Sequence, residues 1–325
     1  MTNEKHPIDW ARFKEIIESY QKFLLTSHIR PDCDALGSEL GMALVLEALG
    51  KDVVIVNGHS TPPNLSFLDP EGRLKALGED VQVSELEAIE VMMVLDTSAW
   101  AQLGPMGDVL RATSALKIVL DHHLGEDDLG AEFFKNTTAE AASRLVVEAA
   151  QQLGVPLTAE MAVPLFAAQA TDTGWYRYMS VTGDALRIAG NLVDAGAVPQ
   201  DIYSELYEQD TVERLKLRGR ILAKTETELS GRLAHTYVEI SDFEATGALA
   251  SDTEDVINLT LCIKGVQFAV ILVEQEAGGF KISFRSRCDL DCSELARKFG
   301  GGGHKAAAGA FVEETLQNAQ SKVLD

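Results

Sequence analysis

Runs of consecutive apolar residues alternate with segments of helical spacing in the first two-thirds of the chain. The apolar runs predict β-strands that are buried on both faces, as in a parallel sheet covered by helices. They lie at residues 23–27, 52–57, 91–96 and 116–121. Segments whose apolar positions recur with a helical period lie at 35–49, 139–153, 159–171 and 184–195. This order predicts an α/β fold with a doubly wound, mainly parallel sheet.

The pattern changes beyond residue 197. Residues 198–229 have helical spacing with charge on most turns, which predicts a helical connector. After the connector, strands are predicted at 233–240, 266–275 and 279–286, a helix at 251–263, and a glycine-rich segment at 299–312. We therefore predict a doubly wound domain over 1–197, the connector over 198–229, and a smaller α/β domain over 230–325.

Length and charge narrow the classes of protein that fit this pattern. A chain of 325 residues is long for one core, which favours two domains. The chain has 28 Lys and Arg against 50 Asp and Glu, a net charge of −22, which argues against binding long duplex nucleic acid. No apolar run approaches the roughly 20 residues that cross a bilayer, and four cysteines are too few for a disulfide scaffold. We expect a reduced, cytoplasmic protein without membrane contact.

Acidic and imidazole side chains follow three of the predicted strands. They are His28, Asp32 and Asp34, then Asp96, then Asp121, His122 and His123; Asp172 ends an apolar helix. A single Asp in such a place is most simply a helix cap. The carboxyl ends of parallel strands share one edge of the sheet, however, so these groups are expected to converge there.

Converging carboxylates repel one another unless cations neutralise them. Four carboxylates carry a charge of −4 and two divalent ions carry +4, so the count predicts a centre of two divalent cations. Oxygen and imidazole ligands favour Mn²⁺ or a similar ion over a metal that prefers thiolates.

Five segments, in this order, resemble the motifs of the DHH phosphoesterases. They are HIRPDCDALGS from His28, LDTS around Asp96, DHH from Asp121, TDTGW around Asp172, and FRSR with FGGGGHKAAAG near the end of the chain. The FRSR and FGGGGHKAAAG sequences resemble the DHH-associated nucleotide-binding domain. Within the family, the chain most resembles members that hydrolyse both short oligoribonucleotides and 3′-phosphoadenosine 5′-phosphate, so the expected partner is a short RNA or small nucleotide.

The resemblance implies a role for each matching residue. One metal ion would be held by His28, Asp32 and Asp96, and the second by Asp34, Asp96, His122 and Asp172, so that Asp96 bridges the two. His123 would face the substrate phosphate and Asp121 would orient an imidazole. Nucleotide binding in the smaller domain would fall to Arg285, Ser286, Gly301, Gly302, Gly303 and His304. Together the ions would activate a water molecule for attack on phosphorus.

Two neighbouring features give further expectations. Cys33 stands between two predicted ligands where the family often has Gly or Ser, and this would make the site sensitive to oxidation. The acidic stretch Glu126–Asp128 is expected to be a solvated loop.

Several other functions are compatible with similar sequence motifs. A cyclic or linear dinucleotide phosphodiesterase is a close alternative, and a RecJ-like single-strand exonuclease is a more distant one because the chain is short and acidic. The glycine-rich tail argues against an inorganic pyrophosphatase, and the intact ligand set argues against a protein without catalytic activity. A homodimer through the first domain is suggested by the resemblance. The net charge predicts a preference for substrates of about two to five nucleotides.

Overall fold

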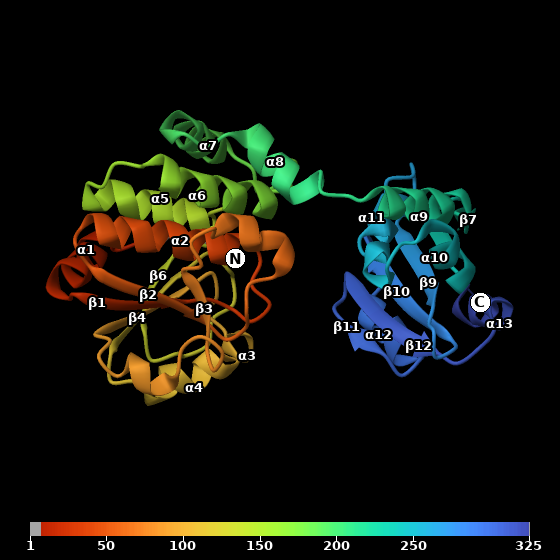
Figure 1. Cartoon of the computed structure of the whole chain (residues 1–325), viewed down its shortest axis with the longest axis horizontal. Coiled ribbons are helices and arrows are strands. Elements are labelled where there is room, and N and C mark those ends of the chain that lie inside the picture. Colours follow the sequence, from red (N-terminus) through yellow and green to blue (C-terminus); the bar gives the residue numbers. More distant parts are fainter. Residues whose placement is uncertain (1–7, 325) are drawn as a thin grey trace. The chain divides into compact units, whose positions relative to one another are not determined.

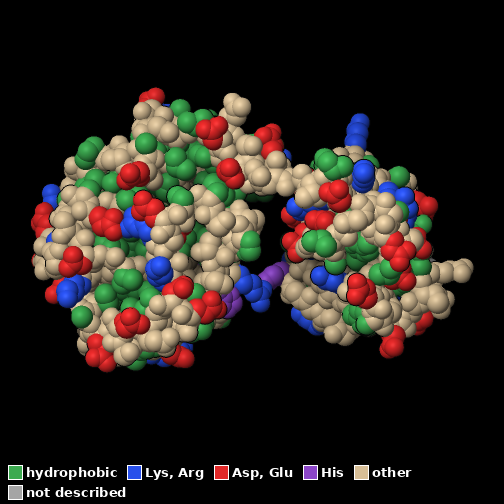
Figure 2. Space-filling view, in the orientation of Figure 1, with side chains coloured by type: hydrophobic (Ala, Val, Ile, Leu, Met, Phe, Trp, Pro, Cys, Tyr) green, Lys and Arg blue, Asp and Glu red, His purple; other side chains and the backbone are tan. Residues whose placement is uncertain are grey.

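The computed structural model describes residues 8–324. The chain forms two compact units, and the boundary between them in the sequence lies between Glu208 and Gln209. Figure 1 shows a sheet with helices in each unit. Within the described residues, no helix has the length and apolar character needed to cross a membrane. Acidic side chains are spread over the visible face of both units, as the net charge of −22 leads one to expect (Figure 2).

The first unit contains a six-stranded sheet in the order β3-β2-β1-β4-β5-β6, with every neighbouring pair parallel. Its strands are β1 (Lys22–Thr26), β2 (Asp52–Asn57), β3 (Leu74–Ala76), β4 (Val91–Leu95), β5 (Leu116–Asp121) and β6 (Glu132–Lys135). The strand order turns back at β1, between β2 and β4, so the sheet is doubly wound as predicted. This is the arrangement that places ligands at the carboxyl ends of the central strands.

Helices cover both faces of this sheet (Figure 1). The larger apolar cluster lies under α1 (Trp10–Ser19), α2 (Cys33–Ala48), α5 (Ala142–Leu153), α6 (Ala159–Asp172), α7 (Gly183–Ala195) and α8 (Pro199–Tyr207). The opposite cluster lies under α3 (Trp100–Leu103) and α4 (Pro105–Ala112). Two 3₁₀ turns, η1 (Pro63–Leu68) and η2 (Val83–Leu86), complete the unit. All five residues of β4 are buried, which explains its continuous apolar sequence.

The second unit has a mixed sheet in the order β11-β12-β10-β9-β8-β7. Its strands are β7 (Glu226–Glu228), β8 (Leu233–Val238), β9 (Phe268–Glu274), β10 (Phe280–Ser286), β11 (Gly302–Gly303) and β12 (Ala307–Val312). Only β8 and β9 pair in parallel. Its helices are α9 (Val212–Ala223), α10 (Ile240–Thr246), η3 (Ala250–Thr253), α11 (Val256–Thr260), α12 (Cys292–Arg297) and α13 (Leu316–Leu324). Apolar clusters on the two faces of the sheet make this a second α/β core.

The segment predicted as one helical connector is divided. Helix α8 ends at Tyr207, and α9 begins at Val212, where the Thr211 side chain accepts a hydrogen bond from the Arg214 backbone N–H. The last part of the predicted connector, Glu226–Glu228, is the edge strand β7 rather than helix. The helix predicted over 251–263 is also shorter, since only Val256–Thr260 are α-helical.

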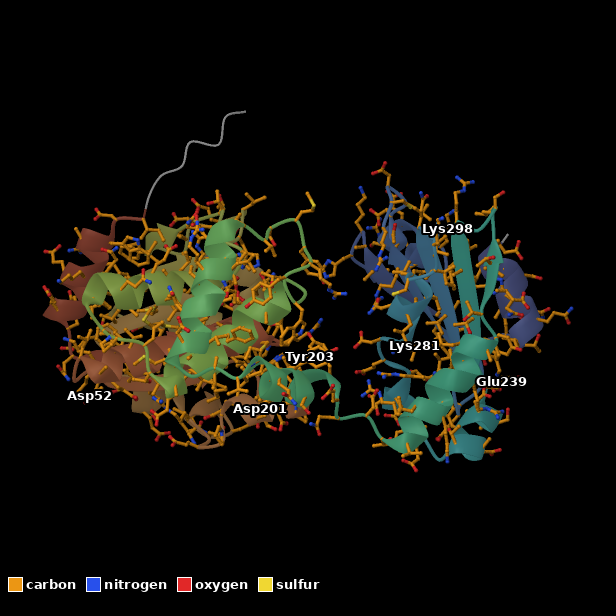
Figure 3. The ribbon with its side chains drawn as sticks, turned by 90° about the horizontal axis from the view of Figure 1, so that it is seen from above. Asp52, Asp201, Tyr203, Glu239, Lys281 and Lys298 are labelled. Carbon is orange, nitrogen blue, oxygen red and sulfur yellow. The ribbon has the colours of Figure 1, made fainter. Side chains whose placement is uncertain are left out.

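An aromatic cluster fixes α8 to the first unit. The Trp175 ring centroid lies 5.0 Å from that of Tyr203 and 6.0 Å from that of Tyr207, both on α8. Tyr203 is labelled on this helix in Figure 3. Gly174, Trp175 and Tyr176 have three successive positive φ values, which make a tight turn that begins two residues after Asp172. The aromatic run after Asp172 therefore packs the helices around the end of α6.

Candidate active site

The predicted site residues of the first unit come from the carboxyl ends of three adjacent strands. His28 follows β1, Asp96 follows β4, and Asp121 ends β5. Because β4 pairs in parallel with both β1 and β5, these three ends lie side by side. Asp172 is the last residue of α6 and reaches the same place.

Two groups of three potential metal ligands form there. His28, Asp32 and Asp96 make one group, and Asp34, His122 and Asp172 make the other; within each, the ligand atoms lie within 4.8 Å of one another. Asp96 faces both groups, with Oδ2 3.4 Å from His28 Nε2 and Oδ1 3.2 Å from His122 Nε2. The geometry therefore brings together the six residues that the sequence suggested as ligands. It also brings His123 close, because Asp96, His122 and His123 form a third such group.

The surroundings of these side chains fit divalent cations. Each imidazole places Nδ1 near a backbone carbonyl, at 3.1 Å from Ile29 O for His28 and at 3.2 Å from Ala139 O for His122. This arrangement leaves Nε2 as the metal-binding nitrogen. Asp96 is 2% exposed, and its Oδ1 receives no hydrogen bond from the described residues. A buried carboxylate oxygen without a donor, facing two imidazoles, is suited to a cation.

The pKa values of these groups show how strongly the site attracts positive charge. Burial raises the pKa of Asp34 to about 8, and the neighbouring Asp96 carboxylate adds to the effect. Burial alone would lower the pKa of His28 and His122, but Asp96 outweighs it and raises them to about 9 and about 10. In the metal-free protein, protons on these imidazoles therefore supply the positive charge that metal cations would supply.

Two of the aspartates also stabilise helix ends. The Asp32 carboxylate accepts a hydrogen bond from the Ala35 N–H at the start of α2, at 3.0 Å. Asp34 accepts from the N–H groups of Ala142 and Ser143 at the start of α5, at 2.6 and 3.0 Å. The helix-cap interpretation of an isolated Asp therefore holds for Asp32, but it does not exclude metal binding, because each carboxylate has further lone pairs.

Asp121 lies behind His123 rather than among the clustered ligands. Its Oδ1 accepts a hydrogen bond from His123 Nδ1 at 2.8 Å, and the side chain is fully buried. Two partners of Asp121 were missed by sequence reasoning: Ser98 Oγ, at 2.7 Å, and Lys135 Nζ, at 3.2 Å. Lys135 lies on the short edge strand β6, which the apolar pattern does not reveal.

Two neighbouring features differ in their exposure. Cys33 is 4% exposed, and burial raises the pKa of its thiol to about 12, which disfavours the reactive thiolate and argues against the expected sensitivity to oxidation. The acidic stretch Glu126–Asp128 is an exposed loop, as expected. Asp127 Oδ2 accepts a hydrogen bond from the Trp100 N–H at 2.7 Å, and the Asp128 carbonyl accepts one from Trp100 Nε1 at 3.0 Å.

The residues predicted to bind nucleotide gather at one end of β10 and β12. Arg285 pairs with Ala307, and β11 pairs with β12 through Gly302 and Gly303. His304 lies next to this pairing and is exposed. A Cβ atom at Gly301 would lie 2.1 Å from the Gly309 carbonyl oxygen. Glycine at this position therefore allows two backbone segments of the unit to approach closely. Gly302 faces open space.

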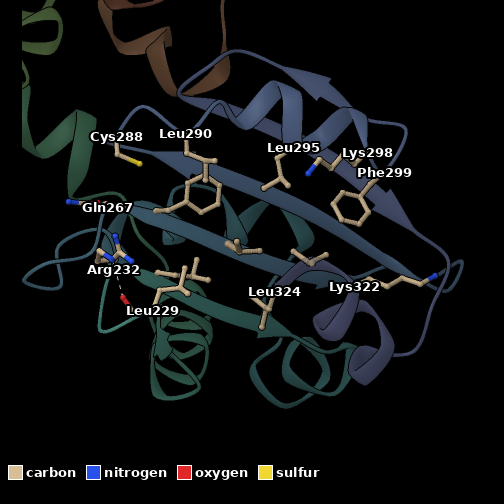
Figure 4. A pocket seen from close by; sticks show the side chains of 14 residues that line it. Leu229, Arg232, Gln267, Cys288, Leu290, Leu295, Lys298, Phe299, Lys322 and Leu324 are labelled. Atoms are coloured by element: carbon tan, nitrogen blue, oxygen red, sulfur yellow. Dashed lines mark hydrogen bonds between the residues drawn. The ribbon is translucent and has the colours of Figure 1, made fainter.

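A separate pocket of about 390 Å³ lies in the same unit (Figure 4). Its walls are mainly apolar side chains such as Phe268, Leu295 and Leu324, with Arg232, Lys298 and Lys322 among the remaining lining residues. None of the six residues predicted to bind nucleotide lines it.

Known proteins are similar to this chain over nearly its whole length. Residues 22–169 match the model of the DHH family, N-terminal domain, and residues 231–325 match that of the DHHA1 domain. The chain is 29% identical to the bifunctional oligoribonuclease and PAP phosphatase NrnA of Thermus thermophilus, over 99% of this chain and 95% of that protein. It is 27% identical to NrnA of Bacillus subtilis, over 91% of each.

A more distant relative carries a different activity. The cyclic-di-AMP phosphodiesterase PdeA of Listeria monocytogenes is 23% identical over 96% of this chain but only 48% of its own length. Among solved structures, an exopolyphosphatase-related protein from Bacteroides fragilis superposes with a TM-score of 0.83 at 27% identity, covering 97% of this chain and 94% of its own. The chain thus has the fold of the Bacteroides fragilis protein.

Proposed function

Because the chain belongs to the DHH phosphoesterases, with a DHHA1 domain after the DHH domain, we propose that it hydrolyses short oligoribonucleotides and 3′-phosphoadenosine 5′-phosphate. The observation that carries the proposal is the position of Asp96 between two groups of carboxylate and imidazole ligands. The NrnA relatives, which match over nearly their whole length, support the choice of substrates.

In this proposal the six clustered residues hold two divalent cations, with Mn²⁺ as the expected ion. His28, Asp32 and Asp96 hold one; Asp34, Asp96, His122 and Asp172 hold the other. When bound, such ions supply an activated water molecule and take up negative charge from the phosphoryl group. From the protein side, His123 Nδ1 donates to Asp121, and Nε2, when the ring is doubly protonated, would donate a hydrogen bond to a phosphoryl oxygen.

In the second unit, Arg285, Ser286, Gly301, Gly302, Gly303 and His304 form the proposed nucleotide-binding set. A guanidinium can bind a phosphate through two parallel hydrogen bonds, and an exposed glycine backbone can approach an anion closely. These groups supply binding energy for the nucleotide and take no part in the attack on phosphorus.

We expect Arg285→Ala to raise the KM for a dinucleotide by about 10- to 100-fold, the effect of losing a hydrogen bond to a charged group. The turnover of a generic phosphodiester, bis(p-nitrophenyl) phosphate, should change little, and bound Mn²⁺ should stay constant. Lys281→Ala is the matched control, because Lys281 is an exposed cation on the same strand (Figure 3). Equal losses on both substrates would contradict the binding role of Arg285.

The substrate class is tested by kcat/KM on 3′-phosphoadenosine 5′-phosphate, a ladder of oligoribonucleotides from dimer to 25-mer, cyclic di-AMP and single-stranded DNA. We expect the ladder to peak at about two to five nucleotides. A chain of net charge −22 offers further phosphates few favourable contacts. The basic residues near the glycine run, Arg297, Lys298 and Lys305, are few.

The same panel decides between the candidate functions. A profile that is flat or rises with length would favour a RecJ-like exonuclease. Preferential cleavage of cyclic di-AMP would favour a dinucleotide phosphodiesterase, the activity that the name of the distant relative PdeA gives.

A further inference from the structure

A buried lysine stands behind the Asp121–His123 pair. Lys135 is the last residue of β6, and the parallel register of β5 and β6 places it directly beside Asp121. Its side chain is only 9% exposed. A lysine ammonium is costly to bury, so it is found in such a place where several acceptors surround it.

Four acceptors surround the Lys135 ammonium. Nζ lies 2.7 Å from Ser98 Oγ and 2.6 Å from the Gly125 carbonyl oxygen. It lies 3.2 Å from Asp121 Oδ2 and 3.6 Å from Glu126 Oε2. The ammonium therefore connects the buried Asp121 carboxylate with the backbone of Gly125, which lies in the same loop as His123, two residues further along.

The two carboxylate oxygens of Asp121 contact different partners. Oδ2 faces Lys135 and the Ser98 hydroxyl. Oδ1 accepts hydrogen bonds from the backbone N–H of His123 at 3.1 Å and from its Nδ1 at 2.8 Å. Lys135 supplies a countercharge for this fully buried carboxylate. The two hydrogen bonds to Oδ1 then hold the His123 ring in one orientation.

We propose that Lys135 is a positioning residue for His123: it balances the charge of Asp121 and donates to the Gly125 carbonyl, and so fixes the orientation of the His123 ring. The inference rests on the proposed phosphoester hydrolysis, in which His123 Nε2 faces the phosphoryl group. Lys135 touches neither the substrate nor any of the six clustered ligands in this scheme.

The loop does not depend on Lys135 for its fold. The Asp127 N–H donates to the Ser98 carbonyl at 2.8 Å, and Trp100 holds Asp127 and Asp128 through the two hydrogen bonds described above. Removing the ammonium should therefore release the His123 ring while the loop keeps its course. This separates a positioning role from a purely structural one.

The test compares Lys135→Met, Lys135→Gln and Lys135→Arg, each fully loaded with Mn²⁺. We expect Lys135→Met to lower kcat by about 10- to 100-fold, as is typical for residues that support an active-site histidine. KM should stay within about twofold, and Mn²⁺ content should not change. Lys135→Arg should recover most of the turnover, and Lys135→Gln, which can bond to Gly125 without a charge, should lie between them. Lys117→Met, at the opposite end of β5, is the control and should match the original protein.

A second readout does not use activity. In metal-free protein, with the His123 signals assigned from a His123→Gln variant, a slowly exchanging Nδ1–H in the ¹H–¹⁵N spectrum of the histidine rings reports the hydrogen bond to Asp121. We expect this signal in the original protein and Lys135→Arg, and its loss by exchange with water in Lys135→Met and Lys135→Gln. An Nδ1–H signal that persists unchanged, or an unchanged kcat, in folded Lys135→Met would overturn the proposal. If the original protein hydrolyses none of the substrates, the proposed function fails, while the spectrum still decides the role of Lys135.

Discussion

Asp96→Asn is expected to lose high-affinity binding of both metal ions and nearly all turnover. Asp96 is the only member of the cluster whose two oxygens face different imidazoles, at 3.4 Å from His28 and 3.2 Å from His122. Asparagine keeps the shape and tolerates the left-handed backbone at this position, where φ is 59°. It removes the charge that balances the cations, so the loss should exceed the 10- to 100-fold typical of supporting residues.

Calorimetric titration with Mn²⁺ and measurement of bound metal after dialysis would check this expectation. Asp108→Asn is the matched control, because that carboxylate is 87% exposed on α4 and belongs to none of the groups of potential ligands. If Asp96→Asn retained two tightly bound ions per chain, Asp96 could not be the residue they share.

Metal-free protein is expected to become less stable as pH rises from about 6.5 to 9. Folding raises the pKa of Asp34 from 3.8 to about 8, that of His28 from 6.5 to about 9, and that of His122 from 6.5 to about 10. Between the unfolded and folded pKa values, the folded state holds protons that the unfolded state has released. Stability is then lost with rising pH, by up to about 1.4 kcal/mol per pH unit for each proton retained.

These groups interact strongly, so their losses do not simply add, and a total of a few kcal/mol is expected. Urea unfolding in EDTA at pH 6.5, 7.5 and 9 would measure it. Saturating Mn²⁺ should reverse the trend, because cations replace the protons and bind more tightly as the imidazoles lose them. A metal-free stability that stays constant or rises over this range would show that the buried groups do not hold protons in the folded state.

The central part of the fold follows from the apolar pattern. Strands β1, β2, β4 and β5 are buried on both faces, which leaves long apolar runs in the sequence. The edge strands β3 and β6 are short and mixed in polarity, so nothing in the local sequence distinguishes them from loops. Missing β6 also meant missing Lys135, whose place beside Asp121 depends on strand register.

The candidate site was predictable to the same degree. Groups at the ends of neighbouring parallel strands must meet, which is why His28, Asp96 and His122 could be expected together. The second contacts of each group depend on tertiary structure, as the hydrogen bonds from the start of α5 to Asp34 show. The division of the segment after residue 197 depended on a threonine cap that competes with continuous helical periodicity.

The backbone of Asp96 links catalysis to the evolutionary history of such chains. An L-residue in the left-handed region is disfavoured by about 1–2 kcal/mol, and glycine is the residue that removes this strain. Drift at this position therefore favours glycine unless the carboxylate is under selection. A relative that keeps the sheet and both domains but has glycine at this position would be expected to have a function other than hydrolysis.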